Sequence, residues 1–345
     1  MEEKVEDIKL EQEVEAKEET LPEQEEKKEQ PQNVDALLPG EKPIEKYESD
    51  RSYANYIEDK RLDFAGTYSK NRKWSYISMG VVMAIAIASV ICLTQKNAAL
   101  NIVGWCLISA AVIGMLVYYI VTKNKMPYLT KEYIKTVSET LNSYNYTHQD
   151  ISEPTCDDKE KVDLADIIVD GVYQDLTNIA SRNVVHARYK GKKVSVSDLG
   201  LYVGTGKNTK STFVGKYVTM ENTLHFKDYF VVTIKNKDQA VDLPTKTEGL
   251  ALLVDEENFS IYGPKDEDLK KIVGTKFLPA IRKLELNNIL LNVNVVIWAG
   301  HSAAYLSYCD EIMTLPFQNV FDGKANDKFK EDLYLVLEAF ELINR

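Results

Sequence analysis

The sequence predicts an α+β protein in which an N-terminal two-helix transmembrane hairpin precedes a soluble domain with a mostly antiparallel sheet and flanking helices. Two long runs without a charged residue, Trp74–Gln95 and Asn97–Thr122, indicate the hairpin, and only Lys96 separates them. Short segments of alternating polarity, which begin at Val184, indicate the sheet. Helical periodicity lies before and after these segments, and this grouping favours an α+β fold over an alternating α/β fold.

Residues 1–50 form an acidic segment that is rich in Glu, Gln, Lys and Pro. They hold 18 acidic and 7 basic residues, so they carry the whole net charge of −11 (7 − 18 = −11). With so few apolar side chains the segment cannot offset the chain entropy lost on folding, and we expect a disordered tail. It is either a solvating segment or an interaction tail that folds on a partner. This charge balance argues against nucleic acid as a partner, and against contact of the tail with anionic lipid.

Residues 51–73 mix aromatic and basic side chains at partly helical spacing. We expect a short juxtamembrane helix that rests on the membrane surface or on the soluble domain.

The basic residues beside the two apolar runs predict the orientation of a hairpin at 74–122. Lys and Arg are retained on the cytoplasmic side of a membrane, so both termini are expected to be cytoplasmic, in a bacterial cell membrane. The flanking residues outnumber Lys96 in the turn by nine to one: Lys60, Arg61, Lys70, Arg72, Lys73, Lys123, Lys125, Lys131 and Lys135.

The two runs contain no Asp, Glu, Lys, Arg or His, so they offer no ion or proton path, and a channel would require several copies. Small residues recur at every fourth position, at Gly80, Ala84 and Ala88 and again at Ala110 and Gly114. Such faces let helix backbones approach closely. Either the two helices pack on each other through these faces or two copies of the chain associate through them, and the sequence does not separate the alternatives.

Residues 123–345 are numerous enough for one hydrophobic core and are expected to form a cytosolic α+β domain. Met126-Pro127 is expected to end the preceding helix, and a new helix should run from Thr130 to about Tyr144. Residues 146–160 are polar, contain Pro154 and are predicted to be a loop. A short helix is predicted at 162–175, with Leu164, Ile167 and Ile168 buried.

The remaining elements of the domain are strands followed by two helices. A helix is predicted from Asp266 to about Leu286, and a closing helix at Asp327–Ile343 should bury Phe329, Leu333, Val336, Leu337 and Phe340. Turns are expected at 255–258 and 299–302. The predicted strands are Val184–Tyr189, Lys193–Ser197, Lys216–Met220, Tyr229–Ile234, Leu250–Val254, Phe259–Tyr262, Asn292–Trp298 and Ala304–Tyr308.

Gly204-Thr205-Gly206-Lys207 is a fragment of a phosphate-binding loop. A complete loop has the pattern G-x-x-x-x-G-K-[ST], in which backbone amides surround the phosphates and the hydroxyl binds magnesium. Here Leu201 stands at the position of the first glycine and Asn208 replaces the hydroxyl residue. We therefore expect a flexible loop between strands.

Metal and thiol chemistry have little support in the sequence. The cysteines form no C-x-x-C pair, and acidic residues follow Cys156 and Cys309, which disfavours a reactive thiolate. Asp163, Asp166 and Asp170 share one helix face, where we expect a solvated acidic surface without the order of a calcium loop. The histidines show no ligand spacing either: His148, His186, His225 and His301.

No catalytic, cofactor-binding or metal-binding residue is therefore predicted, and no cofactor is expected. A site assembled from distant residues stays open as an alternative.

From about Ile151 to Gln318 the chain resembles a family of bacterial membrane proteins catalogued as domain of unknown function 3137. The resemblance implies one or two spans ahead of an α+β domain, and it implies no activity and no functional residue. The long acidic tail departs from the usual start of that family. Four stretches carry the resemblance: 188–198 (RYKGKKVSVSD), 213–217 (FVGKY), 259–262 (FSIY) with 277–280 (FLPA), and the hairpin 293–308.

These observations predict an integral membrane protein whose cytosolic domain binds a protein partner or organises a membrane complex. The alternative is a membrane-tethered enzyme or small-ligand sensor with a site built from scattered residues. A deep pocket lined by polar groups such as His186, His225 or His301 would favour that alternative.

Overall fold

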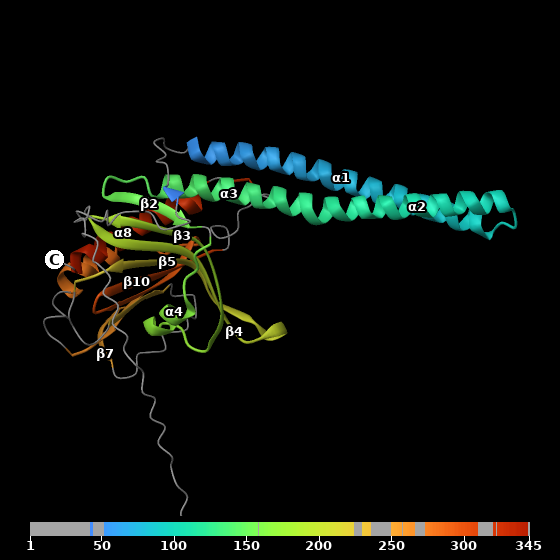
Figure 1. The fold of residues 1–345 in the computed structure, drawn as a ribbon. Coiled ribbons are helices and arrows are strands. Elements are labelled where there is room, and N and C mark those ends of the chain that lie inside the picture. Colours follow the sequence, from blue (N-terminus) through green and yellow to red (C-terminus); the bar gives the residue numbers. More distant parts are fainter. Residues whose placement is uncertain are drawn as a thin grey trace, which may run out of the picture. The chain divides into compact units, whose positions relative to one another are not determined.

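The computed structural model describes residues 42–43, 52–157, 159–223, 230–235, 250–256, 258–265, 273–309, 320–321 and 323–343. The chain divides into two units, residues 1–36 and residues 37–345, and all the described residues belong to the second. This second unit is α+β, with two long apolar helices and an antiparallel sheet (Figure 1).

The predicted disordered tail lies outside the described residues, with one exception. Lys42–Pro43 form a two-residue strand, β1, which pairs with β2 (Ile151–Asp157) at one edge of the sheet. This part of residues 1–50 is therefore attached to the domain.

The helical part consists of α1 (Ser52–Thr94), α2 (Ala98–Ile120), a π-helical turn η1 (Val121–Lys125) and α3 (Met126–Asn145). The expected juxtamembrane helix is continuous with the first apolar run, as one helix of 43 residues. The predicted break at Met126-Pro127 is wrong, because the helix passes through Pro127. A π turn directly before a proline relieves the missing N–H and the steric clash with the preceding turn.

Helix α1 packs against α2 and α3 along a seven-residue repeat, which is the repeat of the core positions in a coiled coil. The buried positions of α1 that follow this repeat are Ala54, Arg61, Ser75, Val82 and Ser89. The side chains at the apolar part of this seam are small, so the backbones approach closely. A methyl group added at Gly104 would lie 2.7 Å from Leu93 Cγ, and one at Gly114 would lie 2.7 Å from Val82 Cγ2.

Four contacts define the register of the helical hairpin. In each contact, the number of residues from Ala98 back to the α1 residue equals the number from Ala98 forward to its partner, to within one. They are Leu93 with Gly104, Val82 with Gly114, Phe64 with Tyr133, and Tyr53 with Tyr144. The antiparallel pairing therefore extends unbroken from the apolar tip to the end that meets the sheet domain.

The sheet has ten strands in the order β1-β2-β3-β4-β5-β10-β9-β6-β8-β7, and each pairing between them is antiparallel. All eight predicted strands are present, several of them longer than expected. Their bounds are β3 Leu176–Tyr189, β4 Lys192–Val203, β5 Lys210–Glu221, β6 Phe230–Lys235, β7 Ala251–Glu256, β8 Phe259–Gly263, β9 Leu290–Trp298 and β10 His301–Tyr308.

The predicted loop at 146–160 is wrong, since it contains β2. Its pairing with β3 is interrupted between Ser152 and Thr155, and Pro154 lies in this irregularity. A proline is compatible with a strand at such a bulge, where no ladder hydrogen bond is required. The predicted turn at 299–302 is shorter than expected, because only Ala299 and Gly300 connect β9 to β10.

Helices cover both faces of the sheet (Figure 1). The closing helix α8 (Lys324–Ile343) packs on one face, and its five predicted core residues are fully buried. The opposite face is covered by α4 (Leu164–Asp170), which buries Ile167. Ile168, however, is exposed, contrary to the prediction. In so short a helix only Ile167 and Asp170, three positions apart, face the sheet.

The helix predicted from Asp266 lies outside the described residues as far as 272. The described remainder is a π turn, η3 (Val273–Phe277), followed by α6 (Leu278–Ile281). The helix therefore ends before Leu286.

Candidate functional site

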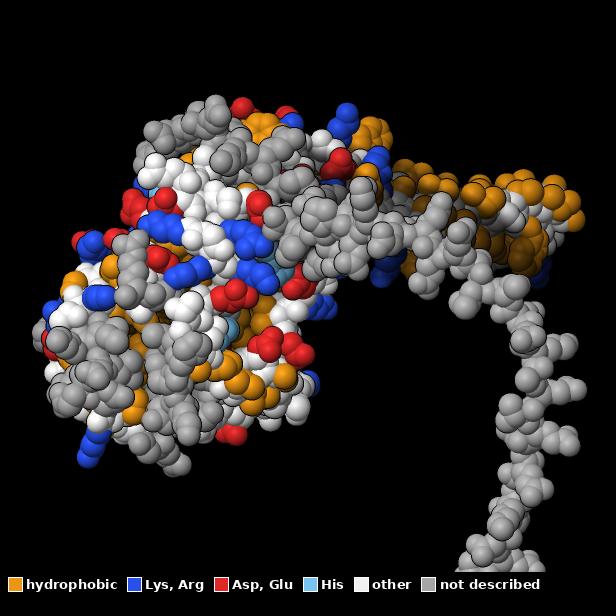
Figure 2. Space-filling view, turned by 60° about the vertical axis from the view of Figure 1, so that its left-hand side comes forward, with side chains coloured by type: hydrophobic (Ala, Val, Ile, Leu, Met, Phe, Trp, Pro, Cys, Tyr) orange, Lys and Arg blue, Asp and Glu red, His pale blue; other side chains and the backbone are white. Residues whose placement is uncertain are grey.

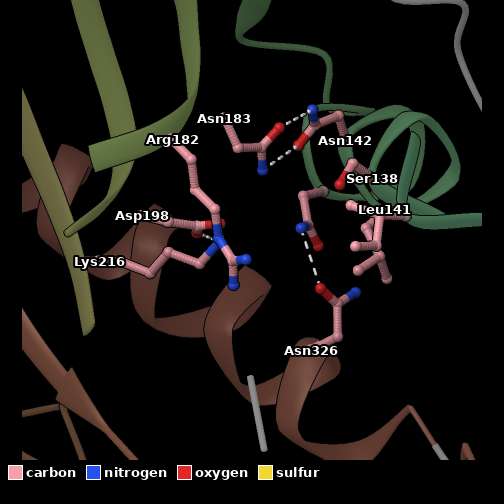
Figure 3. A pocket seen from close by; sticks show the side chains of 10 residues that line it. Ser138, Leu141, Asn142, Arg182, Asn183, Asp198, Lys216 and Asn326 are labelled. Atoms are coloured by element: carbon pink, nitrogen blue, oxygen red, sulfur yellow. Dashed lines mark hydrogen bonds and ion pairs between the residues drawn. The ribbon is translucent and has the colours of Figure 1, made fainter. Parts of the chain in front are cut away.

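A small polar pocket lies where α3 meets the sheet and the first turn of α8 (Figure 3). Its cavity is about 30 Å³, which is room for one or two water molecules and too little for a metabolite. The residues that line it come from five elements: Ile134, Ser138, Leu141, Asn142 and Asn145 of α3, Arg182 and Asn183 of β3, Asp198 of β4, Lys216 of β5, and Asn326 of α8.

Three charged residues form a row across neighbouring strands on one side of the pocket. In the sheet register Arg182 lies beside Asp198, and Asp198 lies beside Lys216. The Lys216 ammonium donates to Asp198 Oδ1, and Arg182 Nε lies 3.5 Å from Asp198 Oδ2. Asp198 and Lys216 are both buried, whereas half of the Arg182 side chain is exposed. The row therefore consists of one negative group between two positive groups, and its Arg182 end is the exposed one.

The buried pair occupies positions that would otherwise belong to the apolar core. Side chains alternate along a strand, so Asp198 shares a face with Val194 and Val196, and Lys216 shares a face with Val218. The Lys216 Nζ also lies 4.7 Å from the centre of the Phe329 ring. Buried charges of this kind are tolerated because each neutralises the other.

Four carboxamide side chains form the opposite side of the pocket (Figure 3). Asn142 and Asn183 exchange two hydrogen bonds, of 2.7 and 3.3 Å, and Asn145 Nδ2 donates to Asn326 Oδ1 at 3.0 Å. Asn183 has a φ of +56°, a conformation that asparagine tolerates better than most residues, at a register shift in β3.

Two polar atoms of these amides have no hydrogen-bond partner among the described residues. They are Asn145 Oδ1, an acceptor, and Asn326 Nδ2, a donor, and both are buried. Both residues line the pocket, so water held there is the expected partner for these atoms.

The pocket adjoins the junction between the helical hairpin and the sheet domain. The hydroxyl groups of Tyr53 and Tyr144 both donate to Asp327 Oδ1, at 2.6 and 3.0 Å. Tyr334 donates to the backbone oxygen of Asn145 at 2.7 Å. Burial raises the pKa of Tyr53, so its hydroxyl stays protonated and remains a donor. These bonds hold the hairpin firmly on α8.

The predicted acidic surface at Asp163, Asp166 and Asp170 is only partly present. Asp163 is exposed and accepts a hydrogen bond from Ala165 N as the N-cap of α4. Asp166 is exposed in the first turn. Asp170 is buried, so the prediction is wrong for this residue. Its spacing from Ile167 places it on the face of α4 that packs on the sheet.

The buried Asp170 carboxylate is surrounded by donors from the sheet. Tyr217 and Tyr305 donate to Oδ2 at 2.8 and 2.7 Å. Trp298 Nε1 and His301 Nε2 lie 3.4 and 3.2 Å from Oδ1. Burial raises the pKa of both tyrosines, which keeps them protonated as donors. This cluster satisfies one buried charge and anchors α4 to the sheet.

The histidines that the sequence singled out do not line the pocket. The His148 ring stacks on Tyr334 at 4.2 Å, and burial lowers the pKa of His148. His186 Nε2 lies 2.6 Å from Glu160, and His301 contacts Asp170. His225 lies outside the described residues. Within the described part of the chain no three His, Cys, Asp or Glu side chains are placed to hold a metal ion.

The two cysteines and the glycine-rich segment that the sequence singled out lie outside the lining of the pocket. Cys156 Sγ lies 3.6 Å from Asn142 Nδ2, and Cys309 is half-buried at the end of β10. Residues 204–207 lie in the connection between β4 and β5, residues 204–209, so the predicted position between two strands is confirmed. A side chain at Gly204 would lie 2.6 Å from the oxygen of Asn208, so glycine is required there.

The fold and the pocket together define an α+β protein in which a long apolar helical hairpin is attached to an antiparallel sheet domain. No family model, curated protein or solved structure matches the chain. The resemblance to domain of unknown function 3137 therefore stays a prediction.

Sequence reasoning did not identify the residues of the pocket. One partial signal was present, since Lys216 begins a predicted strand on the face that Val218 and Met220 share. Asp198 lies one residue beyond the predicted strand Lys193–Ser197 and belongs to β4 only in the structure. The asparagines carried no such signal, because their side chains meet only after α3 packs against β3 and α8.

Proposed function

We propose that this chain is an integral membrane protein whose helical hairpin, residues 74–122, crosses a bacterial cell membrane twice. The observation that carries the proposal is exposed apolar surface. Both helices are long and apolar enough to span a bilayer, and only 11% and 6% of their most apolar windows are buried. Figure 2 shows apolar side chains along the hairpin. Among the most exposed are Ile87, Ile102, Val112, Ile113 and Leu116. Contact with water on this scale is unfavourable.

Both termini are proposed to lie in the cytoplasm, because nine basic residues flank the hairpin and one lies in its turn. Protease added to intact spheroplasts should leave the sheet domain uncut, and it should cut the domain in inverted vesicles. Cleavage in spheroplasts would contradict the orientation. Release of the protein by carbonate without detergent would contradict the membrane placement itself.

The sheet domain is proposed to bind a protein partner or to organise a membrane complex. The support is the attachment of the sheet domain to the helices that continue into the hairpin. Tyr53 of α1 and Tyr144 of α3 both donate to Asp327 of α8, and these bonds would hold a fixed surface of the domain beside the bilayer. The acidic residues 1–50 are a second candidate contact for a partner.

Crosslinking in cells from a photoreactive residue at Leu252, which is exposed on β7, tests this role. Deletion of residues 1–36 and a shuffled tail of the same composition separate the effect of sequence from that of charge. Recovery of self-crosslinks alone would contradict a foreign partner.

A second copy of the chain is the alternative partner. Gly80, Ala84 and Ala88 are exposed on α1, and open space surrounds Gly80, so this small-residue face is not used within the hairpin. Gly114, in contrast, packs on Val82 inside it. Replacing Gly80 by Leu should abolish a dimer seen by crosslinking in detergent, while Ile87→Leu serves as the exposed control.

A sensor of a very small ion is the second candidate function. The pocket is neither deep nor lined by the histidines, so its support is limited to the polar character of its lining. Its polar groups come from scattered residues, and five of its lining residues lie on α3, which is continuous with α2. A small polar ligand there would contact the same helix that enters the membrane. Thermal unfolding of the full chain with and without chloride, nitrate or formate tests this function. A shift that Arg182→Gln removes and Arg188→Gln retains would support it, and no shift with any of them would count against it.

A further inference from the structure

Five exposed basic residues lie where the apolar part of the hairpin ends on the side of the sheet domain. We call them the cationic collar: Lys70, Arg72 and Lys73 of α1, and Lys123 and Lys125 of η1. Figure 2 shows Lys and Arg side chains at this end of the apolar surface.

The register of the hairpin brings the two parts of the collar to one level. Two contacts bracket it: Val82 with Gly114 on the apolar side, and Phe64 with Tyr133 on the domain side. Both pairs are symmetric about the same turn, so the intervening register places Lys73 level with Asn124. The charges from the two helices therefore form one belt around the hairpin.

The collar has no opposite charge nearby in the sequence. No Asp or Glu occurs from Phe64 to Lys131, and the first carboxylates on either side are Asp63 and Glu132. No described carboxylate pairs with a collar residue. Some basic residues of the sheet domain do form ion pairs. Lys192 Nζ, for example, lies 2.7 Å from Glu341 Oε2. Among the described residues, therefore, no carboxylate neutralises the collar. Arg72 Nε donates to the hydroxyl of Tyr76 at 3.2 Å, which leaves its positive charge in place.

Aromatic side chains border the collar on the apolar side. Trp74, Tyr76 and Tyr119 are 62%, 61% and 59% exposed. Such rings settle at the level of lipid headgroups, where an apolar body and a polar tip are both accommodated. Their position indicates that the collar lies at the depth of the lipid phosphates.

We propose that the cationic collar binds the phosphate groups of anionic phospholipids in the cytoplasmic leaflet. This inference rests on the membrane placement proposed above. Each Lys or Arg held near an anionic surface is attracted to it, and the attraction decays within a Debye length. The collar would select anionic lipids around the hairpin and fix the depth at which the sheet domain lies.

The test uses the full chain in nanodiscs made from equal amounts of phosphatidylcholine and phosphatidylglycerol. Native mass spectrometry counts the lipids that stay bound after partial delipidation. The wild type should retain phosphatidylglycerol preferentially. Substitution of all five collar residues by Gln should lower that enrichment by about tenfold, and added salt should lower it in the wild type.

Two matched variants control for charge and folding. Five Gln substitutions at exposed lysines of the sheet domain, Lys193, Lys207, Lys210, Lys265 and Lys276, should leave the enrichment unchanged. A charge-conserving variant, Lys70→Arg, Arg72→Lys, Lys73→Arg, Lys123→Arg and Lys125→Arg, should keep it.

Flotation with pure phosphatidylcholine vesicles separates the two proposals. Flotation together with equal retention of both lipids would overturn the collar and leave the membrane placement standing. Failure to float with any vesicle would overturn both. Loss of enrichment in the lysine control of the sheet domain would also overturn the collar, since total charge would then explain it.

Discussion

The buried pair of Asp198 and Lys216 permits a quantitative prediction for Lys216→Met. Methionine keeps most of the length and apolar contacts of lysine but removes the ammonium that neutralises Asp198. The carboxylate would remain buried, with Arg182 Nε 3.5 Å away as its nearest described positive charge. The Arg182 side chain is 52% exposed, so solvent screens much of its attraction.

Removing one partner of a buried ion pair costs about 3–5 kcal/mol, because the other charge is left uncompensated. Arg182 offsets part of this cost, so we expect a loss at the lower end, about 3 kcal/mol. Removing both charges together, in Asp198→Leu/Lys216→Met, should cost about 1 kcal/mol or less, since well-packed apolar pairs often replace buried ion pairs.

The unfolding of the sheet domain can be followed through a single tryptophan. Trp74 and Trp105 lie in the apolar helices, and Trp298 lies in β9, so the Trp74→Phe/Trp105→Phe background leaves a reporter of the sheet alone. Urea titration of the full chain in detergent, followed by Trp298 fluorescence, yields the free energy of unfolding.

Lys193→Met is the control, because that side chain is 69% exposed and its ion pair with Glu221 is 3.7 Å long. Its cost should stay below about 0.5 kcal/mol. Equal stability of Lys216→Met and the wild type would refute the reasoning. A double variant as unstable as the single one would refute it as well.

Three further predictions follow from other buried groups. Burial raises the pKa of Asp332 from 3.8 to about 6, so the folded state binds this proton more tightly than the unfolded chain. Its contribution to stability is therefore full below about pH 4 and falls by about 3 kcal/mol as the pH rises to about 6, and Asp332→Asn should remove this fall in urea titrations at pH 4 and pH 7. Gly104→Leu should lower the thermal unfolding midpoint of the helices by circular dichroism, because Leu93 occupies the space, whereas Gly80→Leu should not. Asp170→Ala should destabilise the sheet domain by about 2–4 kcal/mol in the Trp298 assay, since several buried donors lose their acceptor, while Asp163→Ala should cost about 1 kcal/mol as a lost helix cap.

The sequence by itself determined the fold class, the apolar hairpin, eight strands and the closing helix. These features have a local cause. A helix or strand that buries one face has apolar residues at the spacing of its own backbone, and this spacing is visible in the sequence. Phe329, Leu333 and Val336 carry the helical period whether or not the sheet beneath them is known. In the same way, the absence of charge in the two apolar runs needs no knowledge of a neighbour.

The tertiary structure decided which polar residues are buried and what they contact. The strand at Ile151–Asp157 forms because β3 offers it a partner, and Asp170 is buried because α4 rests on two tyrosines from distant strands. In the pocket, Asn145 is hydrogen-bonded to Asn326, a residue 181 positions away in the chain. Polar contacts of this kind depend on residues far apart in the chain, and local periodicity carries no record of which partner a side chain will meet.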